Sequence, residues 1–271
     1  MKAAVIQINT TDNIDNNLQS SRRLLEGAAS EGVRLAVLPE TFAFSHVNIP
    51  KEEAADNALK ALDWAKMTAA ELKLFLAAGS VLFPGADGRF YNRSVFFSPE
   101  GEALAQYDKI HLFDCLLPGA VYLESKAIIS GERLARAELN EENYSWRLGW
   151  GICYDLRFPE QFRALSGRGL DILILPAAFT AKTGALHWEI LLRARAIENQ
   201  CYVLAANQGG TIGSGLKCWG HSMIIDPLGN IAAEIADSAA EAYTAAELDY
   251  EGLQRTRREL PALRHRTDIK A

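Results

Sequence analysis

The chain has 271 residues and a mass of 29.8 kDa, with 49% hydrophobic and 23% charged residues, proportions typical of a soluble globular protein that exclude collagen-like, disordered and disulfide-scaffold classes. Its 28 lysines and arginines against 34 aspartates and glutamates give a net charge of −6, and because the basic residues are scattered we expect no nucleic-acid partner. The first apolar run ends at residue 8 and no run approaches the roughly 18 apolar residues of a membrane helix, so we expect no membrane partner and a cytoplasmic location.

Strands and helices alternate along the first half of the chain. Short apolar runs alternate with longer stretches in which apolar or small residues recur at helical spacing, as Leu18, Ser21 and Leu25 do. A hairpin follows, with Pro99 at the first central position of its turn. These patterns predict strands at residues 3–8, 34–38, 74–83, 90–97 and 102–107, and helices at residues 15–31 and 52–72.

The second half repeats this order. Three segments of the first half recur in the second half in the same order. AVLP (36–39) recurs as LILP (173–176), 137 positions later. FLAAG (75–79) recurs as VLAAN (203–207), and SVFFSPEG (94–101) recurs as SMIIDPLG (222–229), both 128 positions later. Each half therefore has the pattern of one sheet covered by helices on one face, and two such sheets can bury their free faces together.

We expect an α/β fold of four layers, an α-β-β-α sandwich with two pseudo-symmetric halves. Because no linker-like run separates the halves, residues 1–271 are expected to form a single domain, with a C-terminal helix and arm at about 250–271. An ordinary doubly wound open sheet would also alternate strands and helices, but the hairpin-forming segments argue against it.

Three polar or reactive residues directly follow apolar strands, where α/β folds gather functional groups. Glu40 follows RLAVLP, Lys109 follows the strand that ends at Tyr107, and Cys153 follows LGWGI. A thiolate can attack a carbonyl, a carboxylate can move protons and an ammonium can stabilise an oxyanion. The three residues therefore predict acyl transfer with no metal and no cofactor.

Each of these residues also has a structural interpretation. A cysteine after a strand is usually a small buried hydrophobe, and we keep that interpretation for Cys115, Cys201 and Cys218. Widely spaced cysteines in a reducing compartment are expected to be thiols rather than bridges. Glu40 alone fits a helix cap, and Lys109 alone fits a surface charge.

Two further patterns are weaker. His111 with Cys115 and Cys218 with His221 have the short spacing of zinc ligands, but about a hundred residues separate the pairs, so we expect no metal. The glycine-bearing loop at 209–216 lacks the sequence of a phosphate loop. That loop and the segment 135–144 are candidates for shaping a pocket.

Longer motifs surround the three residues that follow strands. LPETF contains Glu40, DKIHLFD contains Lys109 and GWGICYDLRFPE contains Cys153, and HWEILLRARAIENQCYVLAANQ and GHSMIIDPLGN follow in the second half. Together these motifs resemble the nitrilase, or carbon–nitrogen hydrolase, superfamily over almost the whole chain. The HLFD and CYDLRFPE wording is similar to the Nit amidase branch, since true nitrilases commonly have tryptophan and glutamate where this chain has Tyr154 and Asp155.

The resemblance implies a four-layer sandwich, usually dimerised, with a role for each matching residue. It makes Cys153 the nucleophile, Glu40 the general base and acid, and Lys109 the oxyanion stabiliser. The backbone N–H of Tyr154 is the implied second oxyanion donor. Glu124, fifteen residues beyond Lys109, is the implied residue that orients the lysine and supports the base.

Two more residues match substrate-binding positions of the Nit branch. Arg157 resembles its substrate-carboxylate clamp, although an ion pair with Asp155 or Glu160 is the structural alternative. Phe179 resembles an aromatic wall of its pocket, although it also fits plain core.

The implied activity is hydrolysis of a small linear, carboxylate-bearing amide, of the deaminated glutathione or omega-amide type, to an acid and ammonia through a thioester. Nitrile or N-carbamoyl hydrolysis is the alternative within catalysis. A non-catalytic binding module on the same fold is the alternative outside it. The implied partners are a small-molecule amide and a second copy of the chain.

Overall fold

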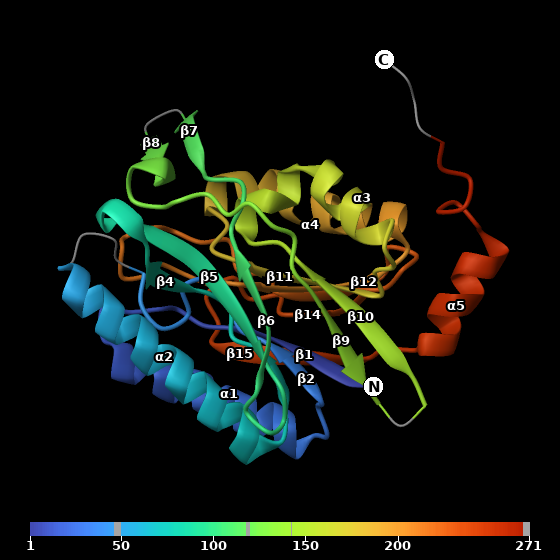
Figure 1. Ribbon diagram of the computed structural model, residues 1–271, viewed down its shortest axis with the longest axis horizontal. Helices are drawn as coiled ribbons and strands as arrows, with labels where there is room; N and C mark the ends of the chain where they lie inside the picture. Colours follow the sequence, from blue (N-terminus) through green and yellow to red (C-terminus); the bar gives the residue numbers. More distant parts are fainter. Residues whose placement is uncertain (46–49, 118–119, 142, 268–271) are drawn as a thin grey trace.

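Two β-sheets lie face to face between layers of helices in this computed structural model, which describes residues 1–45, 50–117, 120–141 and 143–267 (Figure 1). Within these ranges the first sheet has seven strands, in the order β15-β1-β2-β3-β5-β4 with β6 beside β5, and the second has six, in the order β14-β13-β12-β11-β10-β9. Strands β7 and β8 form a separate two-stranded ribbon.

The first half of the chain forms the elements predicted for it, with one exception. The elements are β1 (Lys2–Gln7), α1 (Ile14–Ser30), β2 (Leu35–Val37), α2 (Lys51–Leu72), β3 (Phe75–Ala77), β4 (Val81–Pro84), η1 (Ala86–Gly88), β5 (Phe90–Phe97) and β6 (Ala103–Asp108). The single strand predicted at 74–83 is wrong, because β3 and β4 are separate strands with Gly79 between them. Gly79 has a φ of +46°, and a Cβ there would collide with the carbonyl oxygen of Pro39.

The rest of the chain repeats this order after a short insertion. The insertion comprises β7 (Asp114–Leu117), β8 (Ala120–Leu123) and η2 (Glu124–Lys126). The repeated part comprises β9 (Arg136–Asn140), β10 (Ser145–Trp150), η3 (Cys153–Arg157), α3 (Pro159–Ser166), β11 (Ile172–Ala177), α4 (Ala181–Asn199), β12 (Tyr202–Asn207), β13 (Met223–Ile225) and β14 (Ile231–Glu234).

The two sheets have matching topology. Strands β1-β2-β3 and β10-β11-β12 are parallel, and in each sheet an antiparallel hairpin, β5–β6 or β13–β14, lies beyond the third strand. Parallel neighbours need crossovers, and α1 to α4 supply them on the outer faces. The pseudo-symmetric halves are confirmed, and the doubly wound open sheet is wrong.

Alternating side chains on the central strands separate three apolar layers. Val5 of β1 and Ile174 of β11 lie in the layer between the two sheets. Their neighbours Ile6 and Leu173 point the opposite way, into the layers under α1 and α2 and under α3 and α4 respectively. Figure 1 shows these helix pairs on opposite outer faces. The four-layer α-β-β-α prediction is confirmed.

The C-terminal part of the chain completes the first sheet. Strand β15 (Ala242–Glu247) pairs antiparallel with β1, from Lys2 opposite Glu247 to Gln7 opposite Ala242. Helix α5 (Tyr250–Glu259) follows at the side of the sandwich, at the start of the segment predicted as a helix and arm (Figure 1). Residues 268–271 of that arm lie outside the described residues. No helix in the described ranges is long and apolar enough to cross a membrane.

Candidate active site

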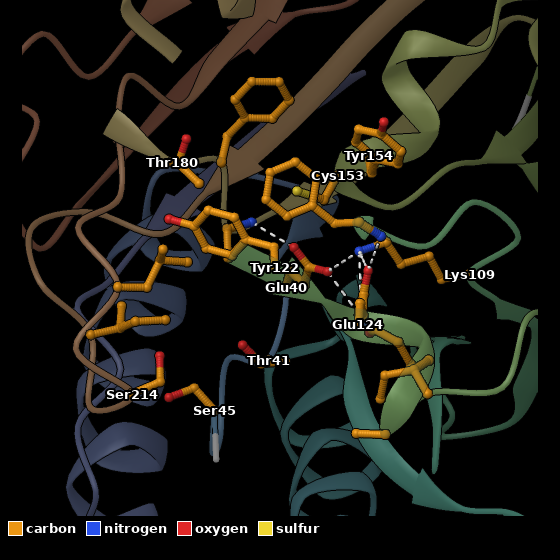
Figure 2. A pocket seen from close by; sticks show the side chains of 18 of the residues that line it. Glu40, Thr41, Ser45, Lys109, Tyr122, Glu124, Cys153, Tyr154, Thr180 and Ser214 are labelled. Atoms are coloured by element: carbon orange, nitrogen blue, oxygen red, sulfur yellow. Dashed lines mark hydrogen bonds and ion pairs between the residues drawn. The ribbon is translucent and has the colours of Figure 1, made fainter. Parts of the chain in front are cut away.

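Glu40, Lys109 and Cys153 lie together at one end of the two sheets. Each comes from the carboxyl end of a different strand, Glu40 after β2, Lys109 after β6 and Cys153 after β10. All three line one cavity of about 340 Å³, and the sticks in Figure 2 show their side chains converging in it. The expectation that these strand ends meet is therefore met in the structure.

The Lys109 ammonium lies between two carboxylates. Its Nζ is 3.0 Å from Oε1 of Glu40, and 2.9 and 3.0 Å from the two oxygens of Glu124. Burial of Lys109 by itself lowers the pKa of the ammonium, but the charges of Glu124 and Glu40 outweigh burial and hold that pKa well above its ordinary value. Lys109 is therefore a fixed, permanently charged cation.

The Glu40 carboxylate is buried and accepts hydrogen bonds at both oxygens. Oε1 accepts from the Asn92 side-chain amide at 2.7 Å as well as from Lys109, and Oε2 accepts from the backbone N–H of Ala178 at 2.7 Å. The backbone is held as well, because Gln208 donates to the Glu40 carbonyl at 2.9 Å. The carboxylate therefore has one defined orientation in the cavity.

Cys153 opens η3 directly after the strand β10. Its φ is +48°, in the left-handed region that non-glycine residues seldom adopt and that is often found at functional sites. Burial raises the pKa of the thiol well above its ordinary value, and the Glu40 charge raises it further against the opposing effect of Lys109. Cys153 is therefore a protonated thiol at neutral pH, with a carboxylate beside it to take the proton.

Glu124 holds the β7–β8 ribbon to Lys109. The residue begins η2 at the end of β8, and besides Lys109 its Oε2 accepts from the backbone N–H of Phe113, at 2.6 Å. The lysine contact is the one that an orienting role for Glu124, implied by the family resemblance, would require. The ribbon itself was not predicted, although it contributes Tyr122 to the cavity.

A buried carboxylate fastens the Cys153 turn to the Lys109 segment. Asp155 accepts from the Tyr107 hydroxyl at 2.6 Å, from the backbone N–H of Ile152 at 2.8 Å and from the backbone N–H of His111 at 2.9 Å. It also contacts Nδ1 of His111 at 2.7 Å. Since Tyr107 and His111 stand two residues on either side of Lys109, these bonds fix the lysine relative to the nucleophile.

Arg157 and Phe179 lie on the same wall of the cavity. The Arg157 guanidinium lies 5.0 Å from the centre of the Phe179 ring and 5.7 Å from that of Tyr154, and its NH1 is 3.2 Å from Nδ1 of His187. In the described part of the chain no ion pair joins Arg157 to a carboxylate, so the alternative of a pair with Asp155 or Glu160 is wrong. Phe179 is both wall and core, because it lines the cavity while packing against Trp188.

The other candidates from the sequence have different positions. Cys201 and Cys218 are buried thiols that are not among the residues lining the cavity, and burial raises the pKa of Cys201 to about 12. The loop 209–216 lines the cavity through Ile212, Ser214 and Leu216. The described residues of the segment 135–144 do not, and half of that segment forms the edge strand β9. Among the described residues no cluster of His, Cys, Asp and Glu has the arrangement of a metal site.

Several cavity residues were missed by sequence reasoning. Asn92 is one, although an asparagine inside the apolar strand FYNRSVFF is a recognisable signal. Three hydroxyl-bearing residues, Tyr122 on β8, Thr183 on α4 and Ser214 in the loop 209–216, also line the cavity, and isolated hydroxyls of this kind carry no such signal. The Asp155 contacts pair segments that lie more than forty residues apart, so they could not be read from local patterns.

Comparisons with known proteins agree with this geometry. The model of the carbon–nitrogen hydrolase family matches residues 2–258. A deaminated glutathione amidase from Synechocystis is 40% identical over 98% of each chain, and a chloroplastic omega-amidase from Arabidopsis thaliana is 35% identical over 96% of this chain and 70% of its own. The crystal structure of Saccharomyces cerevisiae Nit3, a member of the nitrilase superfamily, superimposes with a TM-score of 0.83 at 29% identity, over 96% of this chain and 94% of that one. This chain belongs to the carbon–nitrogen hydrolase family and is an amidase of the nitrilase superfamily, a hydrolase of carbon–nitrogen bonds other than peptide bonds.

Proposed function

We propose that Cys153 is the nucleophile of this amidase, Glu40 its general base and acid, and Lys109 its oxyanion stabiliser. The observation that carries the proposal is the position of the Lys109 ammonium, 3.0 Å from Glu40 in the cavity that Cys153 also lines. A nucleophile, a proton carrier and a fixed cation are the groups that acyl transfer requires. They make a non-catalytic binding module the weaker interpretation.

The reaction proceeds in two halves. Glu40 takes the proton of the Cys153 thiol as the sulfur attacks the amide carbonyl, and then gives that proton to the departing nitrogen, so that the C–N bond breaks, ammonia leaves and a thioester remains. Glu40 next takes a proton from a water molecule that attacks the thioester. The acid is released, and the proton returns to the Cys153 sulfur.

Charge on the carbonyl oxygen is stabilised by Lys109 and by the backbone N–H of Tyr154. Tyr154 directly follows the nucleophile at the start of η3, which supports its backbone N–H as the second donor. Glu124 keeps the ammonium in place through its two contacts of 2.9 and 3.0 Å. Because these groups are fixed before the substrate binds, they need no reorganisation in the transition state.

The substrate is proposed to be a small linear amide that carries a carboxylate. Arg157 lines the cavity with no carboxylate partner among the described residues, and a guanidinium is well suited to bidentate carboxylate binding. Phe179 forms the apolar wall beside it. The names of the two relatives, deaminated glutathione amidase and omega-amidase, support this class of substrate.

Ammonia release from a substrate panel tests the proposal. The panel holds deaminated glutathione, omega-amides of dicarboxylic acids, neutral short amides, nitriles and N-carbamoyl amino acids. We expect the highest kcat/KM for a carboxylate-bearing amide. Cys153→Ala is expected to release no ammonia from any substrate of the panel. Cys115→Ala is the matched control, because that thiol lies on the β7 strand. Preference for a nitrile or a carbamoyl compound would favour the alternative reactions.

We further propose that the chain forms a homodimer through the outer face of α4. Leu186 and Ile190 stand one turn apart on this helix and are 64% and 69% exposed, and exposed apolar side chains grouped in this way are typical of interfaces. Sedimentation of the wild type and of Leu186→Arg tests this, because the substitution is expected to give a monomer.

Two expectations from the sequence also stay proposals. A single domain is supported by the apolar layer that both halves share, and one cooperative unfolding transition tests it. A cytoplasmic location is supported by the four free thiols, and imaging of the tagged chain tests it.

A further inference from the structure

Asn92 contacts two parts of the active site from one position in β5. Its side-chain amide donates to Oε1 of Glu40 at 2.7 Å, and its backbone carbonyl accepts from the backbone N–H of Lys109 at 2.9 Å. The residue is 2% exposed and lines the cavity. A substitution at this position therefore removes the Glu40 contact while the main-chain bond to Lys109 remains.

Burying the Asn92 amide lowers the free energy of unfolding, because within the described part of the chain its oxygen makes no hydrogen bond that would offset the loss of water. Asn92 faces inward from a strand whose other residues are mostly apolar or aromatic, and among the described residues its Oδ1 has no hydrogen-bond partner. A buried polar atom without a partner is unfavourable, and an apolar residue of the same size would avoid the cost. The contact that accounts for the amide is the one to Glu40.

That contact restrains the carboxylate in a way the other donors do not. The Ala178 N–H holds Oε2, and on Oε1 the Lys109 ammonium divides its hydrogen bonds between Glu40 and Glu124. The Asn92 amide, held by a strand, is the donor that fixes Oε1 from a second direction.

We propose that Asn92 is a positioning residue of the amidase reaction, and that its side-chain amide holds Glu40 in the orientation from which it exchanges protons with Cys153 and the leaving ammonia. The inference rests on the proposed role of Glu40. It assigns Asn92 no contact with the substrate, so its effect belongs in kcat and in the pH profile rather than in KM.

Asn92→Leu tests the proposal directly, because leucine has a similar size and no donor. We expect kcat to fall by about 10- to 100-fold, less than the roughly 10²- to 10⁴-fold that proton transfer itself contributes because Glu40 remains, while KM changes by less than about twofold. The acidic limb of the kcat/KM profile is expected to move as well, because Asn92→Leu removes a hydrogen-bond donor from the proposed base.

Asn92→Asp provides a second variant of nearly identical shape. It places a carboxyl group where the amide lies 2.7 Å from Glu40, and two such groups share one proton rather than both ionise. The acidic limb is expected to move further than in Asn92→Leu. If Asn92→Leu does not fold, Asn92→Asp and Asn92→Ser are used for the same measurements.

Ser94→Ala is the matched control. Ser94 stands two residues along β5 on the same face and is 1% exposed. Among the described residues neither its hydroxyl nor the amide oxygen of Asn92 has a hydrogen-bond partner. Removing that hydroxyl perturbs the same strand without reaching the cavity. Its kcat and pH profile are expected to match the wild type.

A double variant separates this inference from the function on which it rests. In a Glu40→Gln background, Asn92→Leu is expected to cause no further loss, because residues that act as a unit are non-additive. A folded Asn92→Leu with wild-type kcat and an unmoved acidic limb would overturn the positioning role, as would a full additional loss in the Glu40→Gln background. Wild-type activity in Glu40→Gln alone would instead overturn the proposed base.

Discussion

The hydroxyl of Tyr107 donates to the buried carboxylate of Asp155 at 2.6 Å, and so joins the strand before Lys109 to the turn that contains Cys153. Gln161 donates to the same hydroxyl at 2.9 Å, which adds α3 to the junction. The relative position of cation and nucleophile is therefore set by bonds between segments far apart in the chain.

Tyr107→Phe is expected to lower both stability and activity. The substitution leaves the buried Asp155 carboxylate with one donor fewer, at a cost of about 1–3 kcal/mol in the free energy of unfolding, and loosens the Lys109 segment. Urea denaturation and kcat measure the two effects. Tyr202→Phe, which removes a hydroxyl bonded to the backbone of Asp249, is the control and should lower stability alone. A kcat of Tyr107→Phe equal to that of Tyr202→Phe would contradict the role of the Tyr107–Asp155 contact in positioning Lys109.

Lys109→Met is expected to reduce kcat by on the order of 10²–10³-fold or more, the usual effect of removing one oxyanion donor. It also leaves the carboxylates of Glu40 and Glu124 without their shared cation, so the free energy of unfolding is expected to fall as well. Glu124→Gln keeps the ammonium and should lose less activity. A Lys109→Met enzyme with full kcat would rule out the oxyanion role.

Arg157→Met tests the substrate class. A carboxylate handle that positions the scissile carbonyl affects kcat as well as KM. We expect kcat/KM to fall by roughly 10²-fold for a carboxylate-bearing amide, given about 3 kcal/mol for a charge-assisted pair, and far less for a neutral short amide. Similar losses on charged and neutral amides would show that Arg157 serves the scaffold.

Stability is expected to fall above pH 9. Burial raises the pKa of Cys201 from 9.0 to about 12. A group whose pKa is higher in the folded state contributes stability that is complete below its unfolded pKa and is lost as pH rises through the folded value. For Cys201 this window runs from pH 9 to about pH 12, at about 1.4 kcal/mol for each pH unit.

Urea midpoints between pH 8 and about pH 11 measure this loss. Cys201→Ala is expected to be less stable at pH 8 because of the cavity it leaves, and to lose less on further increase in pH. Burial also raises the pKa of Cys153, so some alkaline loss should persist in that variant. Parallel pH profiles for Cys201→Ala and the wild type would contradict the assignment.

The sequence predicted what local patterns determine. Each of Glu40, Lys109 and Cys153 follows its own strand. The carboxyl ends of the parallel strands β2 and β10 hold Glu40 and Cys153, one in each sheet, as the strand-end rule predicts. Lys109 follows β6, the second strand of an antiparallel hairpin. The repeat of SVFFSPEG as SMIIDPLG indicated a hairpin in each half, and hence two sheets rather than one.

What the sequence did not predict depends on contacts between distant segments. The break at Gly79 follows from the close approach of the Pro39 carbonyl, forty residues earlier, and β15 pairs with the first strand from the other end of the chain. Asn92 on β5 reaches Glu40, which follows β2, across the intervening strand β3. Such pairings become visible only when the register of the sheets is known.

The most direct test of the account is the mass of the enzyme during turnover. Rapid acid quenching of the wild type with a carboxylate-bearing amide, followed by peptide mapping, should place an acyl group on Cys153, with ammonia released in equal amount before the acid appears. Cys153→Ala should be folded, inactive and unmodified. An acyl group on Cys115, Cys201 or Cys218, or turnover near the wild-type rate in Cys153→Ala, would contradict the account.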